Sequence, residues 1–239
     1  MSNAPSKVIS MSSQSPIKLK PESALQIANP QDLLTIRYPA TQSFVGKFDG
    51  VESSHGNFEL GGTKPKIVFR GRKYKLVKIH IHELSEHVVG GDSPSQFEVH
   101  FVHIPVHGEG SDPKVVLGVL YRESEEAERL CGDEAIIASL GDEEGCGTEK
   151  GDGKPTHSVT PARFFPRVCG SSEPDFDSWY YYEGSLTSYP YSEDVSWFVM
   201  KDEAVVHPDE TRAFKRCSQQ HARGLQPLER RLVLRSFGE

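Results

Sequence analysis

Short stretches in which apolar and polar residues alternate occur along most of the chain, separated by glycine, proline and small polar residues. A period of two is typical of β-strands that bury one face. The run 115–121 is instead continuously apolar and rich in β-branched residues, which predicts a strand buried on both faces. We predict strands at 33–38, 43–49, 58–60, 66–70, 115–121 and 194–201, a hairpin over 74–105 joined at 90–94, and an extended segment at 229–237.

Two segments have helical spacing. Residues 123–140 place apolar side chains among charged ones at intervals close to a helical turn, and residues 207–217 begin with Asp209 and Glu210, which favour the positive end of a helix dipole. The stretch 141–161 is rich in glycine and acidic residues and predicts a surface loop. Because strands predominate, we predict a mainly β fold with a single domain at 14–239, preceded by a flexible arm at 1–13.

The composition narrows the range of partners. The chain has 239 residues, a net charge of -7 and a mean hydropathy of -0.49. No apolar run approaches the roughly 20 residues of a membrane span, and the scattered lysines and arginines argue against nucleic acid. Residues 1–20 lack the apolar centre of a secretory signal, so we expect a cytoplasmic protein unless a signal peptide has been removed. We also expect a monomer or a weak dimer.

The four cysteines form no CxxC pair, which argues against a cysteine-based metal site. Free thiols in a reducing compartment are the interpretation that we favour for Cys131, Cys146, Cys169 and Cys217. A second metal site through Cys131, Cys146 and His157 is the alternative.

Candidate chemistry lies in the predicted hairpin. His80 and His82 are two residues apart on one strand and would project from the same face. Glu98 and His100 have the same spacing on the next strand, which could bring a third imidazole opposite the first pair. Three imidazoles on a rigid sheet suit tetrahedral Zn²⁺ with an open fourth position for water, which is typical of a catalytic site. The alternative is that these histidines are incidental polar residues of a structural β-sandwich.

With these elements placed, the chain resembles the α-class carbonic anhydrases over residues 14–237. The motifs that carry the resemblance stand in the family's order. The family's QSPI, HxHW, SEH, ELHLVH, VLG, YPGSLTTPP and QPLNNR motifs correspond to residues 14–17, 80–83, 85–87, 97–103, 116–118, 182–190 and 226–231.

The resemblance implies a large, twisted, mostly antiparallel central sheet with a few peripheral helices, and Zn²⁺ bound by His80, His82 and His100. It also implies reversible hydration of CO₂ to bicarbonate and a proton by a zinc-bound hydroxide, because Zn²⁺ lowers the pKa of its bound water to about 7. By the same resemblance, Glu98 would hold the ring of His100 in its ligating tautomer.

Further roles follow from the resemblance. Thr187 would accept the hydrogen of the hydroxide and donate its own to Glu86, although a threonine there could also be an ordinary turn residue. His55 would be the proton shuttle if the turn at 53–57 aligns without a one-residue slip; otherwise it is a surface histidine. The substrate pocket, which could equally be plain core, would be lined by Val102, Val116, Leu186, Ser188, Val195 and Trp197.

The chain departs from the family pattern at several positions. Lys78 replaces the glutamine that would accept a hydrogen bond from the first ligand, and a lysine cannot accept one. Glu83, Ser188 and Tyr189 replace a tryptophan, a threonine and a proline, and the aromatic segment that usually precedes the first motif is missing. A slower enzyme would follow, and the rival interpretation is a carbonic-anhydrase-related binding protein with weak or no catalysis.

Overall fold

A computed structural model of the chain describes residues 12–49, 57–127, 156–209, 211, 215, 218 and 222–238. Strands dominate this part of the chain, as the alternating sequence predicts. The strands are β1 (Lys18–Leu19), β2 (Leu25–Gln26), β3 (Leu34–Arg37), β4 (Phe44–Asp49), β5 (Asn57–Leu60), β6 (Lys66–Phe69), β7 (Arg72–Glu83), β8 (Val88–Val89), β9 (Phe97–Pro105), β10 (Lys114–Glu123), β11 (Thr156–Val159), β12 (Trp179–Gly184), β13 (Val195–Met200), β14 (Ala204–Val206) and β15 (Leu234–Arg235).

Helices are short in the described part of the chain. They are the 3-10 turns η1 (Pro21–Ser23) and η2 (Pro161–Phe164) and the single-turn α1 (Pro30–Leu33). Residues 208, 209, 211 and 215 are also helical, in agreement with the helix predicted at 207–217. None of the helices seen in the described residues is long and apolar enough to cross a membrane.

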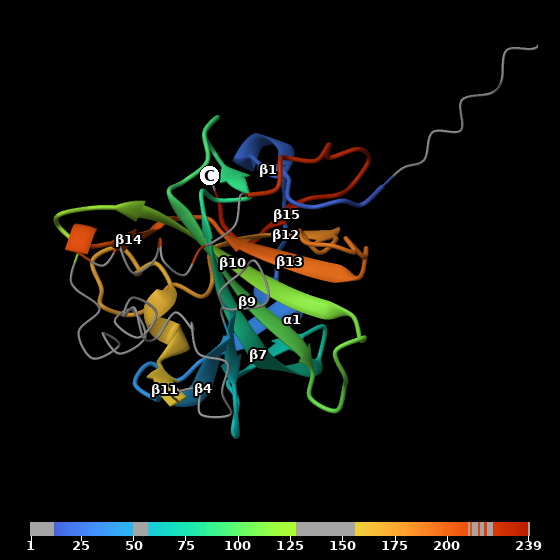
Figure 1. Ribbon diagram of the computed structural model, residues 1–239. Coiled ribbons are helices and arrows are strands. Elements are labelled where there is room, and N and C mark those ends of the chain that lie inside the picture. The colour runs from blue at the N-terminus through green and yellow to red at the C-terminus, as the bar shows by residue number, and fades with distance from the viewer. Residues whose placement is uncertain are drawn as a thin grey trace, which may run out of the picture.

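Most strands join one large mixed sheet, in the order β11-β4-β5-β7-β9-β10-β13-β12-β15-β2. Its central pairs, β5–β7, β7–β9 and β9–β10, are antiparallel, whereas β10 runs parallel to β13 and β14. Figure 1 shows the twisted sheet with β7, β9 and β10 side by side at its centre. The predicted fold, a mainly β, mostly antiparallel sheet with few helices, is confirmed.

Two apolar clusters cover the two faces of the central strands. One contains Ile79, Phe101 and Leu117, and the other contains Val102, Val116 and Trp197. Successive residues of β9 and β10 therefore enter opposite clusters, and β9 is buried along its whole length. The central strands have both faces covered, which fits the continuous apolar run at 115–121.

Three local predictions are wrong. Leu33 ends α1 rather than starting a strand. Glu123 ends β10 instead of beginning a helix, because it pairs with Val206 of β14, and residues 124–127 form a turn; residues 128–140 lie outside the described residues. Residues 156–159 form β11 on the edge of β4 rather than a loop. In the last two cases pairing with a distant strand overrides the local sequence preference.

Other predictions are only partly covered. The arm at 1–13 lies outside the described residues up to residue 11, and Ser13 donates its backbone N–H to Glu193 over 2.9 Å. The domain boundary at residue 14 therefore stays a prediction. The segment 229–237 is regular strand only at β15.

Candidate metal centre

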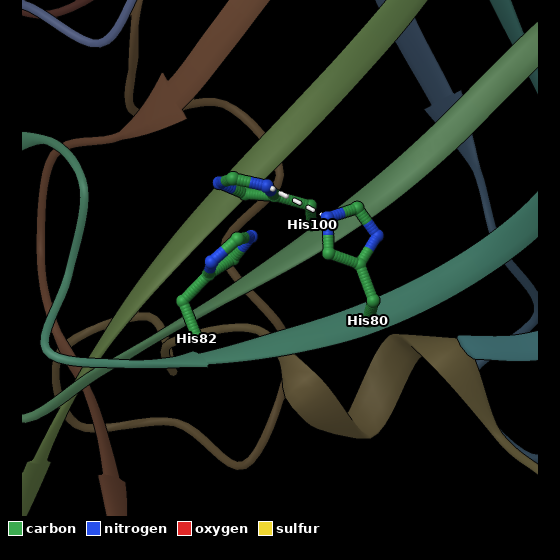
Figure 2. Close-up of side chains that lie close together, drawn as sticks. All are labelled: His80, His82 and His100. Carbon is green, nitrogen blue, oxygen red and sulfur yellow. Dashed lines mark hydrogen bonds between the residues drawn. The ribbon is translucent and has the colours of Figure 1, made fainter. Parts of the chain in front are cut away.

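The antiparallel register of β7 and β9 brings the three predicted histidines together. His80 lies directly opposite His100, and His82 lies opposite Glu98. Ile79 and Ile81 pack into the cluster behind the sheet, so His80 and His82 project from the other face. Figure 2 shows the two rings on one strand with His100 facing them from the next.

The geometry of this histidine cluster fits a tetrahedral metal ion. One ring nitrogen from each histidine lies within 4.8 Å of the other two, and Nδ1 of His100 is 3.2 Å from Nε2 of His80. Two nitrogens held about 2.0–2.1 Å from one tetrahedral ion would be separated by about 3.3 Å. His82 and His100 are buried and His80 is half-buried, so the cluster is consistent with a metal site formed before the metal binds.

Glu98 orients His100 from behind. Its Oε1 lies 2.9 Å from Nε2 of His100, which leaves Nδ1 to face the other two imidazoles. The other carboxylate oxygen accepts the backbone N–H groups of Glu86 and His87 over 2.8 and 2.9 Å. Burial alone would raise the pKa of Glu98, but the imidazoles of His87 and His100 outweigh it and hold this pKa well below its usual range. The contact between Glu98 and Nε2 of His100 is the one that the predicted role of Glu98 requires.

A series of buried polar contacts supports Glu98, and the sequence did not reveal these contacts. Nδ1 of His87 lies 2.7 Å from Oε1 of Glu98, and Nε2 of the same ring lies 2.7 Å from the hydroxyl of Tyr182. That hydroxyl donates to Oγ of Ser15 over 2.8 Å, which also accepts the backbone N–H of Ser185. Every member is buried. The only available signal was that these residues stand inside recognisable motifs, which says nothing of their contacts.

Glu86 and Thr187 meet at the edge of the histidine cluster. Oε2 of Glu86 lies 3.6 Å from Nε2 of His82 and 4.0 Å from Nδ1 of His100. Its Oε1 accepts the backbone N–H of Arg223 over 3.0 Å. Burial raises the pKa of Glu86, while His100 and a hydrogen bond with the Thr187 side chain oppose that rise. The structure thus brings the predicted pair together, with the carboxylate directed at the imidazoles.

Three of the six predicted pocket residues lie in one row across the sheet. Val102 of β9 pairs with Val116 of β10, which pairs with Trp197 of β13. This row is two residues along the strands from the row that holds His80 and His100, a step of about 7 Å. Val195 belongs to the same apolar cluster, and the half-buried Leu186 packs against it. An apolar wall therefore adjoins the imidazoles. Ser188 is half-buried in the loop after Thr187.

Several candidates fall outside the described residues. These are His55, Cys131, Cys146, Cys217 and the side chain of His157, so their predicted roles stay predictions. Cys169 is an exposed free thiol.

Comparison with known proteins gives a family match over nearly the whole chain. The family described as eukaryotic-type carbonic anhydrase matches residues 3–237. The chain belongs to the carbonic anhydrase family. It is 32% identical to alpha carbonic anhydrase 3 of Arabidopsis thaliana over 224 residues, covering 92% of this chain and 73% of the relative.

Solved structures agree on the fold of this carbonic anhydrase family member. The alpha-carbonic anhydrase of Photobacterium profundum matches with a TM-score of 0.68 at 25% identity, covering 93% of this chain and 88% of that chain. A dioscorin complexed with ascorbate matches with a TM-score of 0.70 at 24% identity, covering 94% and 85% of the two chains.

Two departures from the carbonic anhydrase pattern flank the histidines. Lys78 stands two residues before His80 on β7, directly opposite Glu59 of β5, and burial of most of its side chain lowers its pKa. Glu83 ends β7 and is exposed, so its carboxylate points away from the imidazoles.

Proposed function

We propose that this protein is a zinc-dependent carbonic anhydrase that interconverts CO₂ and bicarbonate. One observation carries the proposal: the buried carboxylate of Glu86 lies within 4.0 Å of two imidazoles of the histidine cluster, beside Thr187. A purely structural metal site needs no such pair. Membership of the family supports the same conclusion.

His80, His82 and His100 would hold the metal. When bound there, Zn²⁺ supplies a hydroxide nucleophile near neutral pH. Glu98 fixes the ring of His100 so that the lone pair of Nδ1 faces the cluster, and His87 and Tyr182 in turn fix Glu98. The donor set is neutral, which favours a metal-activated water over a closed structural site.

Thr187 directs the nucleophile. Its hydroxyl would donate to the Glu86 carboxylate, which would leave its oxygen to accept a hydrogen bond from the nucleophile and to orient it. The backbone N–H of Arg223 holds the other oxygen of Glu86, so the carboxylate cannot rotate freely. Such positioning lowers the barrier by removing unproductive orientations before the reaction.

CO₂ would bind against the apolar row formed by Val102, Val116 and Trp197. An apolar wall suits an uncharged substrate, because it excludes water without offering competing hydrogen bonds. For the proton that leaves, we propose His55 as the relay, since the sequence predicts a turn at 53–57 and Asn57 of β5 pairs with His80.

A pair of variants at Thr187 tests the proposal. In the zinc-loaded protein, Thr187→Ser keeps the hydroxyl and should keep most of the CO₂ hydration rate, whereas Thr187→Ala should lower kcat/KM about 100-fold. Stopped-flow hydration with a pH indicator measures both. Equal rates in the two variants would remove Thr187 from the mechanism.

A second candidate is a binding protein that keeps the fold and the metal site with weak catalysis. Lys78 and Glu83 favour it, because they occupy the positions of a hydrogen-bond acceptor and a tryptophan in the family pattern. The fold match to dioscorin, whose structure holds ascorbate, adds a precedent for a small-molecule ligand on this fold. Zinc binding without hydration by the unmodified protein would select this candidate.

For the setting, we propose a cytoplasmic monomer or weak dimer whose partners are CO₂ and bicarbonate, with neither nucleic acid nor membrane as a partner. The net charge of -7 supports the exclusion of nucleic acid.

A further inference from the structure

Lys78 lies on the face of β7 that carries the histidines. Ile79 packs into the cluster behind the sheet, so Lys78 and His80 project from the opposite face. The register between β7 and β9 shifts between Leu76 and Lys78, and Val77 also packs against the cluster on the histidine side. Lys78 pairs with Val102, and it therefore continues the apolar row at the end nearest to β5.

The ammonium group of Lys78 has no close anionic partner among the described residues. Glu59 and Lys114 are the charged groups that act on it, and the exposed Glu59 lies farther than 4.0 Å from it. Other lysines nearby are bonded: Nζ of Lys75 donates to the carbonyl of Val106 over 3.0 Å. Lys78 is half-buried beside apolar residues, where an uncompensated ammonium attracts an anion more strongly than it would on an open surface.

Lys114 adds a second positive charge on the same face. Val115 packs behind the sheet while Val116 belongs to the histidine side, so Lys114, two residues before Val116, projects to the histidine side. Its side chain is 15% exposed, and its Nζ lies 3.6 Å from Asp194. Asp194 offsets much of the charge of Lys114 but not that of Lys78.

We propose that Lys78, with Lys114 behind it, makes this end of the apolar row a subsite for a small carboxylate-type monoanion of the size of bicarbonate. The subsite deepens the proposed function and rests on it for the identity of the natural ligand. An uncharged CO₂ would lie along the apolar residues, and the anion would lie beside Lys78. The ammonium contributes as a fixed charge and takes no part in proton transfer.

Acetate is the probe, because it has the carboxylate geometry and does not react. Its dissociation constant is measured at neutral pH by NMR titration of backbone amides, in the zinc-loaded protein and after removal of zinc. Lys78→Gln should raise this constant about 3- to 10-fold in both forms, and Lys78→Arg should restore it to within about twofold. Lys73→Gln removes an exposed charge from the same strand and should leave it unchanged.

An unchanged constant in Lys78→Gln, or no acetate binding by the unmodified protein up to about 100 mM, would overturn the subsite. CO₂ hydration measured on the same samples separates the two proposals. Hydration without an effect of Lys78→Gln on acetate leaves the function standing and removes the subsite. If Lys78→Gln weakens acetate binding but the unmodified protein does not hydrate CO₂, the subsite stands and the proposed function is removed. The anion is then the ligand of a binding protein.

Discussion

A β-carbon added to Gly118 would stand 2.7 Å from Oε1 of Glu98. Gly118 lies opposite His100 in the β9–β10 pair, so the missing side chain is what gives the Glu98 carboxylate room beside that ring. The same oxygen contacts both His87 and His100. A glycine in the middle of a buried strand is thereby tied to the metal centre.

Gly118→Ala should therefore displace Glu98 and loosen the ring of His100. We expect zinc affinity to fall about 10- to 100-fold, as for loss of a group that orients a ligand. Competition with a zinc-binding dye measures the affinity. Gly110→Ala is the control, because a β-carbon there meets nothing within 4 Å. Equal affinities in the two variants would show that Glu98 does not need this space.

The buried hydrogen bonds behind Glu98 predict that two tyrosines of β12 contribute differently to stability. Tyr182→Phe removes the hydroxyl that joins His87 to Ser15 and should lower the free energy of unfolding by about 1–3 kcal/mol. Tyr180→Phe is the matched change, since the Tyr180 ring packs edge-on against Phe237 and its hydroxyl bonds no described residue; it should cost under about 0.5 kcal/mol. Urea unfolding measures both free energies. Similar losses in the two variants would contradict a stabilising role for the hydrogen bonds of Tyr182.

His103 predicts a dependence of stability on pH. Its Nδ1 donates to the carbonyl of Val115 over 3.0 Å, so its Nε2 accepts from the hydroxyl of Tyr38. Burial lowers the pKa of His103 from 6.5 to about 3. Between these two pKa values the unfolded protein binds a proton on His103 and the folded protein does not. The free energy of unfolding should therefore fall as pH drops from 6.5 towards 3, by about 1.4 kcal/mol per pH unit.

The matched measurement uses urea unfolding at several pH values in this window. His103→Gln keeps a donor and an acceptor but does not titrate, so its stability should fall less steeply with acid. His107→Gln changes an exposed histidine and should follow the unmodified protein. Parallel curves for all three proteins would show that His103 is not the group responsible.

How far the sequence predicts the site depends on whether a relation is local. His80 and His82 share a face because of the two-residue period of a strand, which any alternating sequence displays. Their meeting with His100 depends on the strand register, and that register includes a shift between Leu76 and Lys78 that no local pattern reveals. The resemblance to a family supplied this step. The contacts of Tyr182 with His87 and Ser15 join residues 95 and 167 positions apart, beyond the reach of pattern reasoning.

The errors in the fold have the same origin. Glu123 begins a run of charged residues with helical spacing, but Glu123 itself pairs with Val206 of β14, which the chain reaches only after some eighty residues. The edge strand β11 likewise forms where a loop was predicted, because β4 offers it a partner. Both cases show pairing between distant segments deciding against local preference.

Hydration of CO₂ by the protein before removal of zinc, after removal by a chelator, and after addition of one equivalent of zinc tests the central claim most directly. We expect catalysis to disappear with the metal and to return with it, and His100→Ala should neither retain zinc nor hydrate CO₂. A fully zinc-loaded protein that hydrates CO₂ no faster than buffer up to about pH 9, where water on aqueous zinc itself ionises, would contradict the account.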